Sequence, residues 1–305
     1  MAKKPATRRP PAKVSNGRPA GLFTWLAVGL VVLVVAALVI IKVTSGSTGS
    51  SGSSAFQATD PTTLSELTTI PASVFDTIGV TSPVAPVTPP QVIAGQPALT
   101  ETVNGKTLPQ VFFFGAEYCP FCAAQRWPVI IALSRFGTWS DLGNMTSSSS
   151  DIDPSTPTFT FRNAKYSSPY IAFKSVEFET NVYDSATSSY TKLQTPTKPQ
   201  LALFDKYDTS KYIKGLASSD DGSIPFMSLG NKFLVSGASY TPATLSGLSR
   251  SAIAQGLDTT TSPITEAIIT SANYLTAAFC SLTKNEPSSV CTSSAVVAAK
   301  KIMKI

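Results

Sequence analysis

Four consecutive residues carry the clearest chemistry of this sequence, Cys119-Pro120-Phe121-Cys122. They stand between an apolar run typical of a buried strand and a helix predicted over residues 120–136. Free backbone N–H groups and the helix dipole stabilise a thiolate at a helix N-terminus, so we expect Cys119 to be the nucleophile. Cys122 lies one turn further into the helix, where we expect it to be less exposed and to resolve a mixed disulfide.

The motif also fits a static disulfide, or half of a zinc site completed by Cys280 and Cys291, and both alternatives stay open. Structural zinc favours two tight cysteine pairs, and a separation of 11 residues matches that pattern poorly. The chain has no histidine, which excludes Ser-His-Asp and Cys-His nucleophiles and all His-ligated metal sites. No phosphate-binding or dinucleotide-binding motif is present, so we expect neither a metal nor a cofactor.

The run over residues 115–122 resembles the strand-to-helix turn of the thioredoxin superfamily. Residues 126–128 and 132–137 resemble an uncharacterised subfamily, domain of unknown function 929. This resemblance covers roughly residues 64–291. It implies an α/β, thioredoxin-like fold with an insertion between the CxxC helix and the cis-Pro strand.

The resemblance also implies a substrate-binding region. Ile224-Pro225 matches the cis-proline of the superfamily, which lies beside the CxxC turn and pairs its backbone with an extended peptide. We therefore take Ile224, Pro225, Pro120 and Phe121 as candidate substrate-binding residues.

Two departures from the superfamily concern protons and charge. Phe113 stands where the superfamily has a buried acid that helps move a proton to or from the second cysteine. Phe121 stands where the strongest oxidant of the superfamily has histidine, so we expect a less acidic Cys119 and a less oxidising disulfide. Glu117 is close in sequence, but we expect a solvent-facing carboxylate there.

With Cys119 and Cys122 coupled, Cys280 and Cys291 are left as a second pair. We expect a structural disulfide that joins two helices. The alternative is a relay that exchanges with the first pair. For a loop of about a dozen residues the chain-entropy account gives about 3 kcal/mol of stabilisation.

Beyond the motif, the N-terminal charge pattern predicts a membrane anchor. Residues 1–20 carry six basic residues and no acid, and 23 uncharged, largely apolar residues occupy positions 19–41. We expect a single transmembrane helix over residues 21–43 with a cytoplasmic N-terminus. A cleaved signal peptide is the alternative, but no convincing cleavage site follows the apolar segment.

The remaining chain, from Val43 on, has 17 basic and 18 acidic residues, so we expect no nucleic-acid partner. We predict a basic cytoplasmic tail (1–20), the transmembrane helix (21–43), a Ser/Gly linker (44–60) and an exported thioredoxin-like domain (61–305). The expected partners are exported cysteine-containing proteins or a membrane redox partner.

Periodicity and turn signals predict the elements around the motif. Hairpin turns are expected at Asn104-Gly105 and Gly230-Asn231. Strands are predicted at 111–114, 159–161, 170–178, 226–229 and 232–235. Helices are predicted at 62–78 with an interruption at Pro71, at 120–136 with a kink at Pro128, and at 241–255, 262–282 and 293–303, and residues 196–215 are expected to be partly helical.

Two functions fit these observations. The first is a membrane-anchored thiol–disulfide oxidoreductase that acts on exported proteins through Cys119 and Cys122. The second is a non-catalytic thioredoxin-like module that binds a peptide or partner and keeps its disulfides static. The sequence does not separate oxidase, reductase and isomerase.

Overall fold

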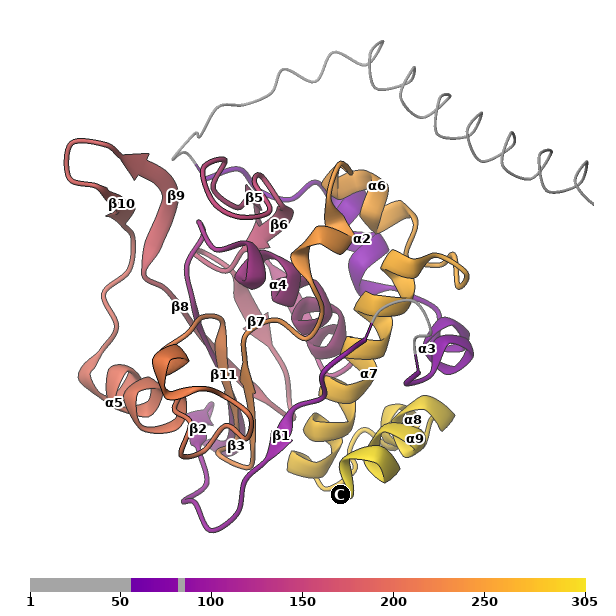
Figure 1. Ribbon diagram of the computed structural model, residues 1–305. Helices are drawn as coiled ribbons and strands as arrows, with labels where there is room; N and C mark the ends of the chain where they lie inside the picture. Colours follow the sequence, from indigo (N-terminus) through magenta and orange to yellow (C-terminus); the bar gives the residue numbers. More distant parts are fainter. Residues whose placement is uncertain (1–55, 82–85) are drawn as a thin grey trace, which may run out of the picture. The chain divides into compact units, whose positions relative to one another are not determined.

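Strand β3 (Lys106–Gly115) runs through the centre of a mixed sheet in the computed structural model, which describes residues 56–81 and 86–305 (Figure 1). The first part of β3 pairs antiparallel with β2 (Thr100–Val103), and its second part pairs parallel with β8 (Ala172–Glu177). On its other side β3 pairs antiparallel with β11 (Phe226–Leu229). The sheet continues through β12 (Phe233–Ser236) to the short β1 (Gln91–Val92).

Both faces of β3 are covered, as its continuous apolar run predicts. Val111 and Phe113 belong to the larger core, which the helices on one side of the sheet complete. Phe112 and Phe114 point to the opposite face, where a smaller core includes Tyr207 at the end of α5 (Lys198–Tyr207). Because successive side chains of the strand point to opposite faces, β3 contributes to two separate cores.

The remaining helices lie on the side of the larger core, with α5 across the sheet from them (Figure 1). They are α2 (Pro61–Thr68), α3 (Ala72–Ile78), α4 (Pro120–Ser134), α6 (Arg250–Gln255), α7 (Pro263–Leu282), α8 (Ser288–Cys291) and α9 (Ser294–Met303). Of these, α4 is buried along nearly its whole length and carries the Cys119–Cys122 motif at its start.

Helix α4 continues through Pro128 without interruption. Proline has no N–H to donate to the carbonyl four residues earlier, which here is Ala124. The buried hydroxyl of Tyr240 donates to Ala124 O instead, at 2.8 Å. A side chain from a distant segment thus donates the hydrogen bond that Pro128 cannot donate to this carbonyl.

Short strands fill the segment between α4 and β11. They are β4 (Thr138–Ser140), β5 (Gly143–Thr146), β6 (Pro157–Thr160), β7 (Lys165–Ser167), β9 (Glu179–Asp184) and β10 (Ser189–Lys192). They form three two-stranded sheets, β4–β7, β5–β6 and β9–β10.

The turn signals are confirmed at both hairpins, where Asn104 and Gly105 have φ of 50° and 77° and Gly230 and Asn231 have φ of 62° and 54°. The helix predicted over residues 241–255 is wrong. A 3₁₀ turn, η2 (Pro242–Leu245), comes first, and α6 begins only at Arg250. Gly247 between them has φ of 76°, which a right-handed helix does not allow.

The predicted fold class, a thioredoxin-like fold preceded by a single transmembrane helix, is corrected by the structure. The described residues form a mixed α/β fold around a mixed sheet, and none of their helices is long and apolar enough to cross a membrane. The longest of them, α7, has 20 residues but includes Glu266, Asn273 and several Ser and Thr side chains. The span predicted over residues 21–43 lies outside the described residues.

Candidate functional site around Cys119 and Cys122

Cys119 is the N-cap residue of α4 and comes four residues after the end of β3. Its Sγ accepts a hydrogen bond from the backbone N–H of Cys122 at 3.1 Å. Both side chains are buried, Cys119 with 4% and Cys122 with 0% of its surface exposed. The strand-to-helix turn thus places both sulfurs at the helix N-terminus, as the sequence predicts.

The two thiols differ in acidity because their surroundings differ. Burial opposes ionisation of Cys119, but hydrogen bonds from Cys122 and the positive charge of Arg126 outweigh it and lower the pKa of the Cys119 thiol. Burial raises the pKa of Cys122 well above its ordinary value, and its interaction with Cys119 adds to the increase. Cys119 is therefore the sulfur that ionises first.

Ile224 and Pro225 lie beside Cys119, although 105 residues separate Ile224 from it. The antiparallel register of β3 and β11 places Phe114 opposite Phe226, so the end of one strand and the start of the other share one edge of the sheet. The Ile224–Pro225 peptide bond is cis, and the Cys119 thiol donates to Ile224 O at 3.7 Å.

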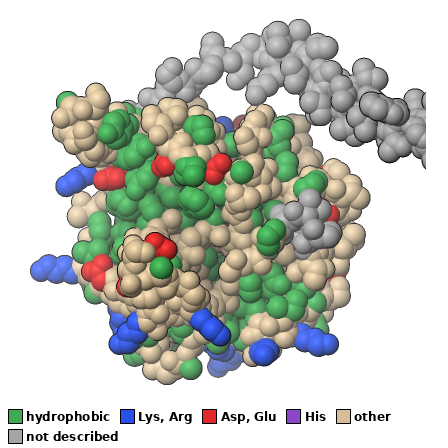
Figure 2. All heavy atoms as spheres, in the orientation of Figure 1, with side chains coloured by type: hydrophobic (Ala, Val, Ile, Leu, Met, Phe, Trp, Pro, Cys, Tyr) green, Lys and Arg blue, Asp and Glu red, His purple; other side chains and the backbone are tan. Residues whose placement is uncertain are grey.

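The other two candidate substrate-binding residues differ in exposure. Pro120 is buried, whereas Phe121 has 39% of its surface exposed. On the face drawn in Figure 2, hydrophobic side chains gather between the β9–β10 hairpin and the segment that contains α5. Phe121 is therefore the member of the motif that a partner can contact directly.

A fully buried ion pair lies next to the motif. Arg126 Nε is 2.8 Å from Glu177 Oε1, and neither side chain is exposed to solvent. Arg126 also donates to Ala116 O at 2.8 Å, while its Nη1 has no hydrogen-bond partner among the described residues. Arg126 follows Cys122 by one helical turn, so its charge lies on the same side of α4 as the Cys122 sulfur.

Glu117 belongs to the same buried cluster, so the solvent-facing carboxylate expected there is wrong. Its exposed fraction is 2%, and the Thr160 hydroxyl contacts both Glu117 and Glu177. Burial raises the pKa of Glu117 to about 7, and the negative charge of Glu177 adds to the increase. A hydroxyl has one proton to donate, so the bridge favours one protonated carboxyl of the two.

Phe113 is fully buried on β3 and has no group that accepts a proton. Its ring lies under the Arg126 guanidinium, with 5.7 Å between the guanidinium carbon and the ring centroid. A Cβ atom at Gly115 would lie 2.9 Å from Cys122 Sγ and 2.9 Å from the Phe113 ring, so Gly115 leaves the space that both occupy. The buried carboxyls of this region come from Glu117 and Glu177 instead.

Sequence comparison assigns the family. The model of a family described as Domain of unknown function (DUF929) matches residues 100–281, more than half of the chain. The chain belongs to the DUF929 family. The match includes both cysteines of the motif, the Arg126–Glu177 pair and Pro225. No curated protein and no solved structure matches the chain.

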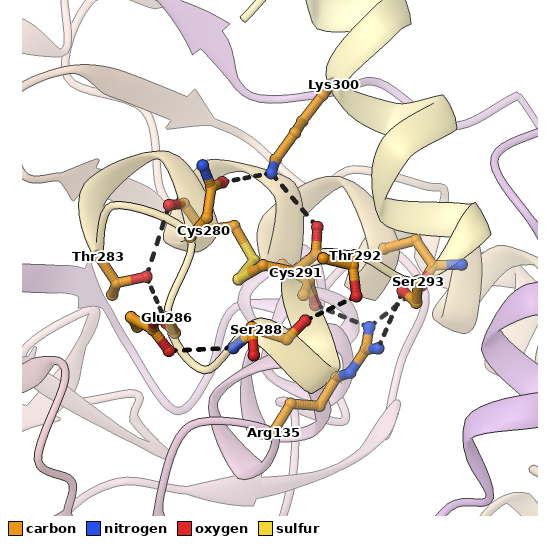
Figure 3. Close-up of a disulfide and its surroundings, with 12 residues drawn as sticks. Arg135, Cys280, Thr283, Glu286, Ser288, Cys291, Thr292, Ser293 and Lys300 are labelled. Carbon is orange, nitrogen blue, oxygen red and sulfur yellow. Dashed lines mark hydrogen bonds between the residues drawn. A yellow bond between two sulfur atoms is a disulfide. The ribbon is translucent and has the colours of Figure 1, made fainter.

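The second cysteine pair of this DUF929 chain is a disulfide, as the sequence predicts. Cys280 in α7 is bonded to Cys291 in α8, with 5.5 Å between their Cα atoms (Figure 3). The zinc alternative is excluded because these two thiols are bonded to each other. In the part of the chain that the structure describes, no group of three or more His, Cys, Asp or Glu side chains is arranged to hold a metal ion.

The disulfide lies at the other end of α4 from the motif. Arg135, the C-cap residue of α4, donates to Ser293 Oγ at 3.5 Å beside the disulfide (Figure 3). Helix α4 has 15 residues, so its two ends are about 22 Å apart. This arrangement gives no support to a relay between the two pairs.

The buried ion pair was not predicted, although the sequence contains a signal for it. The helix over residues 120–136 is apolar on all sides, and a charge on such a helix must be paired when it is buried. Of the two charges on this helix, Arg126 and Arg135, Arg126 lies in the middle of the apolar sequence. Its partner Glu177 is 51 residues away, so the sequence alone does not name it.

Proposed function

We propose that this DUF929 domain is a thiol–disulfide oxidoreductase acting on cysteine-containing exported proteins. Cys119 is the attacking residue and Cys122 the resolving residue. The observation that carries the proposal is the difference in position between two sulfurs at one helix N-terminus: Cys119 is the N-cap residue beside Ile224 O, and its Sγ accepts from Cys122 N, whereas Cys122 is fully buried. In these positions the pKa of Cys119 is lowered and the pKa of Cys122 is raised. A static pair has no need of such a difference.

In the reducing direction, the Cys119 thiolate attacks one sulfur of a substrate disulfide. A Cys119–substrate disulfide forms, and the other substrate sulfur leaves as a thiolate that takes a proton. Cys122 then loses its proton and attacks Cys119 Sγ, which releases the second substrate thiolate and closes the Cys119–Cys122 disulfide. Two electrons pass from the dithiol to the substrate, and the reverse sequence oxidises a substrate dithiol.

The buried cluster supports both steps. The positive charge of Arg126 favours the thiolate form of each cysteine. Glu117 has a pKa of about 7, so it is the carboxyl of the cluster that can exchange a proton near neutral pH.

The Cys280–Cys291 disulfide supports an oxidising compartment, because structural disulfides are rare where thiols are kept reduced. Exported proteins are the cysteine-containing substrates of such a compartment, and a separate redox partner would return the Cys119–Cys122 pair to its starting state.

A binding module with a static Cys119–Cys122 bridge is the second candidate. The observation that favours it is the 4% exposure of Cys119, which restricts direct attack by large partners.

Trapping separates the two candidates. In the Cys122→Ser variant the resolving thiol is gone, so mixed disulfides through Cys119 should accumulate on incubation with a disulfide-containing protein. The matched control is Cys119→Ser, in which the fully buried Cys122 should trap far less. If neither variant forms mixed disulfides with either a protein or a small disulfide, the binding module becomes the better account.

A further inference from the structure

The β9–β10 hairpin places aromatic side chains directly beside the nucleophile. The ring of Tyr190 on β10 stacks on Tyr118, the residue before Cys119, with 4.1 Å between centroids and 4° between planes. Tyr183 on β9 packs edge-on against Tyr190 with centroids 5.3 Å apart, and 46% of its surface is exposed. With Phe121 on α4, these residues define an aromatic surface: Tyr118, Phe121, Tyr183 and Tyr190.

The base of the hairpin is fixed to the segment that leads to Cys119. Phe178 N donates to Gly115 O at 3.0 Å, and Glu117 N donates to Glu179 O at 2.9 Å. The Phe178 ring stacks on Phe114 with 5.3 Å between their centroids. Because these contacts lie on both sides of the turn after β3, the hairpin keeps its register relative to the nucleophile.

Charged groups near Tyr118 are mainly acidic. Burial is the main cause that raises the pKa of Tyr118, and negative charge at Cys119, Glu179, Cys122 and Asp151 adds to the increase. Lys192 pairs with Glu179 across the hairpin. The carboxylates of Glu179 and Asp151 act on Tyr118 at this surface, which disfavours acidic segments.

We propose that this aromatic surface selects substrates: it binds an extended segment whose cysteine is flanked by an aromatic or large apolar side chain and not by acids. The inference rests on the proposed oxidoreductase function. Tyrosine rings give flat contact area at a low cost in conformational entropy. Pairs of aromatic rings also attract each other more strongly than the apolar area that they bury accounts for. The occupant must carry a cysteine because the surface adjoins Cys119.

The test compares two peptides that differ only beside the cysteine, one with Phe and one with Ala, each as a mixed disulfide with 2-mercaptoethanol. Reduction by the wild-type dithiol should be about threefold to tenfold faster for the Phe peptide. In Tyr190→Ala the ratio of the two rates, Phe peptide to Ala peptide, should fall close to one. Tyr190→Phe should keep the wild-type ratio because the ring remains.

Two further variants protect the test from a folding defect. Tyr183→Ala changes an exposed side chain and should lower the ratio by a smaller factor. Thr191→Ala is the matched control, because it truncates an exposed side chain next to Tyr190 on the same strand without removing a ring. The inference is overturned if both peptides are reduced at equal rates, or if Tyr190→Ala and Tyr183→Ala both keep the wild-type ratio.

Binding separates this inference from the proposed function. The same two peptides with serine in place of cysteine cannot react, and the Phe form should bind the wild-type domain about threefold to tenfold more tightly. Tighter binding without any reduction would support the aromatic surface and reject the oxidoreductase. If both cysteine peptides are reduced at equal rates and both serine peptides bind equally tightly, the oxidoreductase is supported and the role of the aromatic surface is rejected.

Discussion

The two cysteine pairs of the chain lie near opposite ends of α4 and have different surroundings. Cys119 and Cys122 lie at the N-terminus of α4, beside a buried arginine and two buried carboxyls. Cys280 and Cys291 lie where α7 passes into α8 and are bonded to each other; Lys300 Nζ is 3.4 Å from Cys291 O, and Arg135 donates to Ser293 beside the disulfide. The first pair has groups that tune a thiolate, whereas the second is closed into a bridge.

This difference shows that a cysteine's chemistry depends on what lies within a few ångströms of its sulfur. Both pairs are nearly inaccessible to solvent, so burial alone does not distinguish them. The N-cap position of Cys119, with the hydrogen bond that its Sγ accepts from Cys122 N, distinguishes the first pair, whereas the second is closed into a disulfide. Changes in these surroundings, made separately, should affect the two pairs independently.

The largest effect is expected for Arg126→Met, which leaves Glu177 buried without its cation. We expect the free energy of unfolding to fall by about 3–5 kcal/mol, measured by urea denaturation. The double variant Arg126→Met, Glu177→Gln has no unpaired buried charge and should recover much of the loss. A double variant as unstable as the single one would show that packing, not charge, is responsible.

Removal of the second pair should come next in size. Cys280→Ala with Cys291→Ala should lower the free energy of unfolding by about 3 kcal/mol. The rate at which Cys119 is alkylated in the folded domain should stay the same, because α4 separates the two sites. A changed alkylation rate would contradict the independence of the two pairs.

The raised pKa of Glu117 predicts a pH-dependent stability. The folded domain holds this proton up to about pH 7, whereas the unfolded chain loses it near the ordinary glutamate value of about 4.3. Stability from this group is therefore full below about pH 4 and is lost as the pH rises through 7. Glu117→Gln should flatten the profile and gain about 3 kcal/mol at pH 8 relative to the wild type. Parallel profiles of variant and wild type from pH 5 to pH 8 would reject this account.

The smallest effect is a shift in thiol titration. In the Cys122→Ala variant, alkylation of Cys119 should reach half its maximal rate below the free-thiol value of about pH 8.5. This variant keeps the backbone N–H that donates to Cys119 Sγ but removes the Cys122 thiol, which also hydrogen-bonds Cys119, so the midpoint should lie above that of the wild type. Adding Arg126→Lys, which keeps the charge, should change the midpoint little. If the midpoint for Cys119 equals that of a free cysteine, the surroundings of the first pair do not favour a thiolate, and this difference between the two pairs is rejected.

Local signals predicted much of the fold. The residue pairs Asn104-Gly105 and Gly230-Asn231 determine their turns within a few residues, and both hairpins are present. The interruption at Pro71 separates α2 from α3 as expected. The helix expected over residues 241–255 failed because helical spacing extends across Gly247, where the chain adopts a left-handed conformation.

The site was predictable only in part. The motif and its helix are local features, whereas the buried ion pair needs Arg126 and Glu177 from elements that meet only in three dimensions. Glu117 looked exposed because it lies in a turn, but β6 and β8 cover that turn and Thr160 contacts its carboxyl. The Tyr118–Tyr190 stack was equally hidden, since the β9–β10 strands are short and mostly polar.

Gly115 offers a criterion that applies to other DUF929 sequences. A Cβ atom at this strand end meets both the Cys122 sulfur and the Phe113 ring at 2.9 Å, closer than such contacts normally come. A family member with alanine or a larger residue at this position must therefore move one of the two. The single position aligned with Gly115 becomes a diagnostic marker: glycine there is compatible with a dithiol arranged as in this chain, and any other residue indicates that the second sulfur, the ring at the Phe113 position or both lie elsewhere.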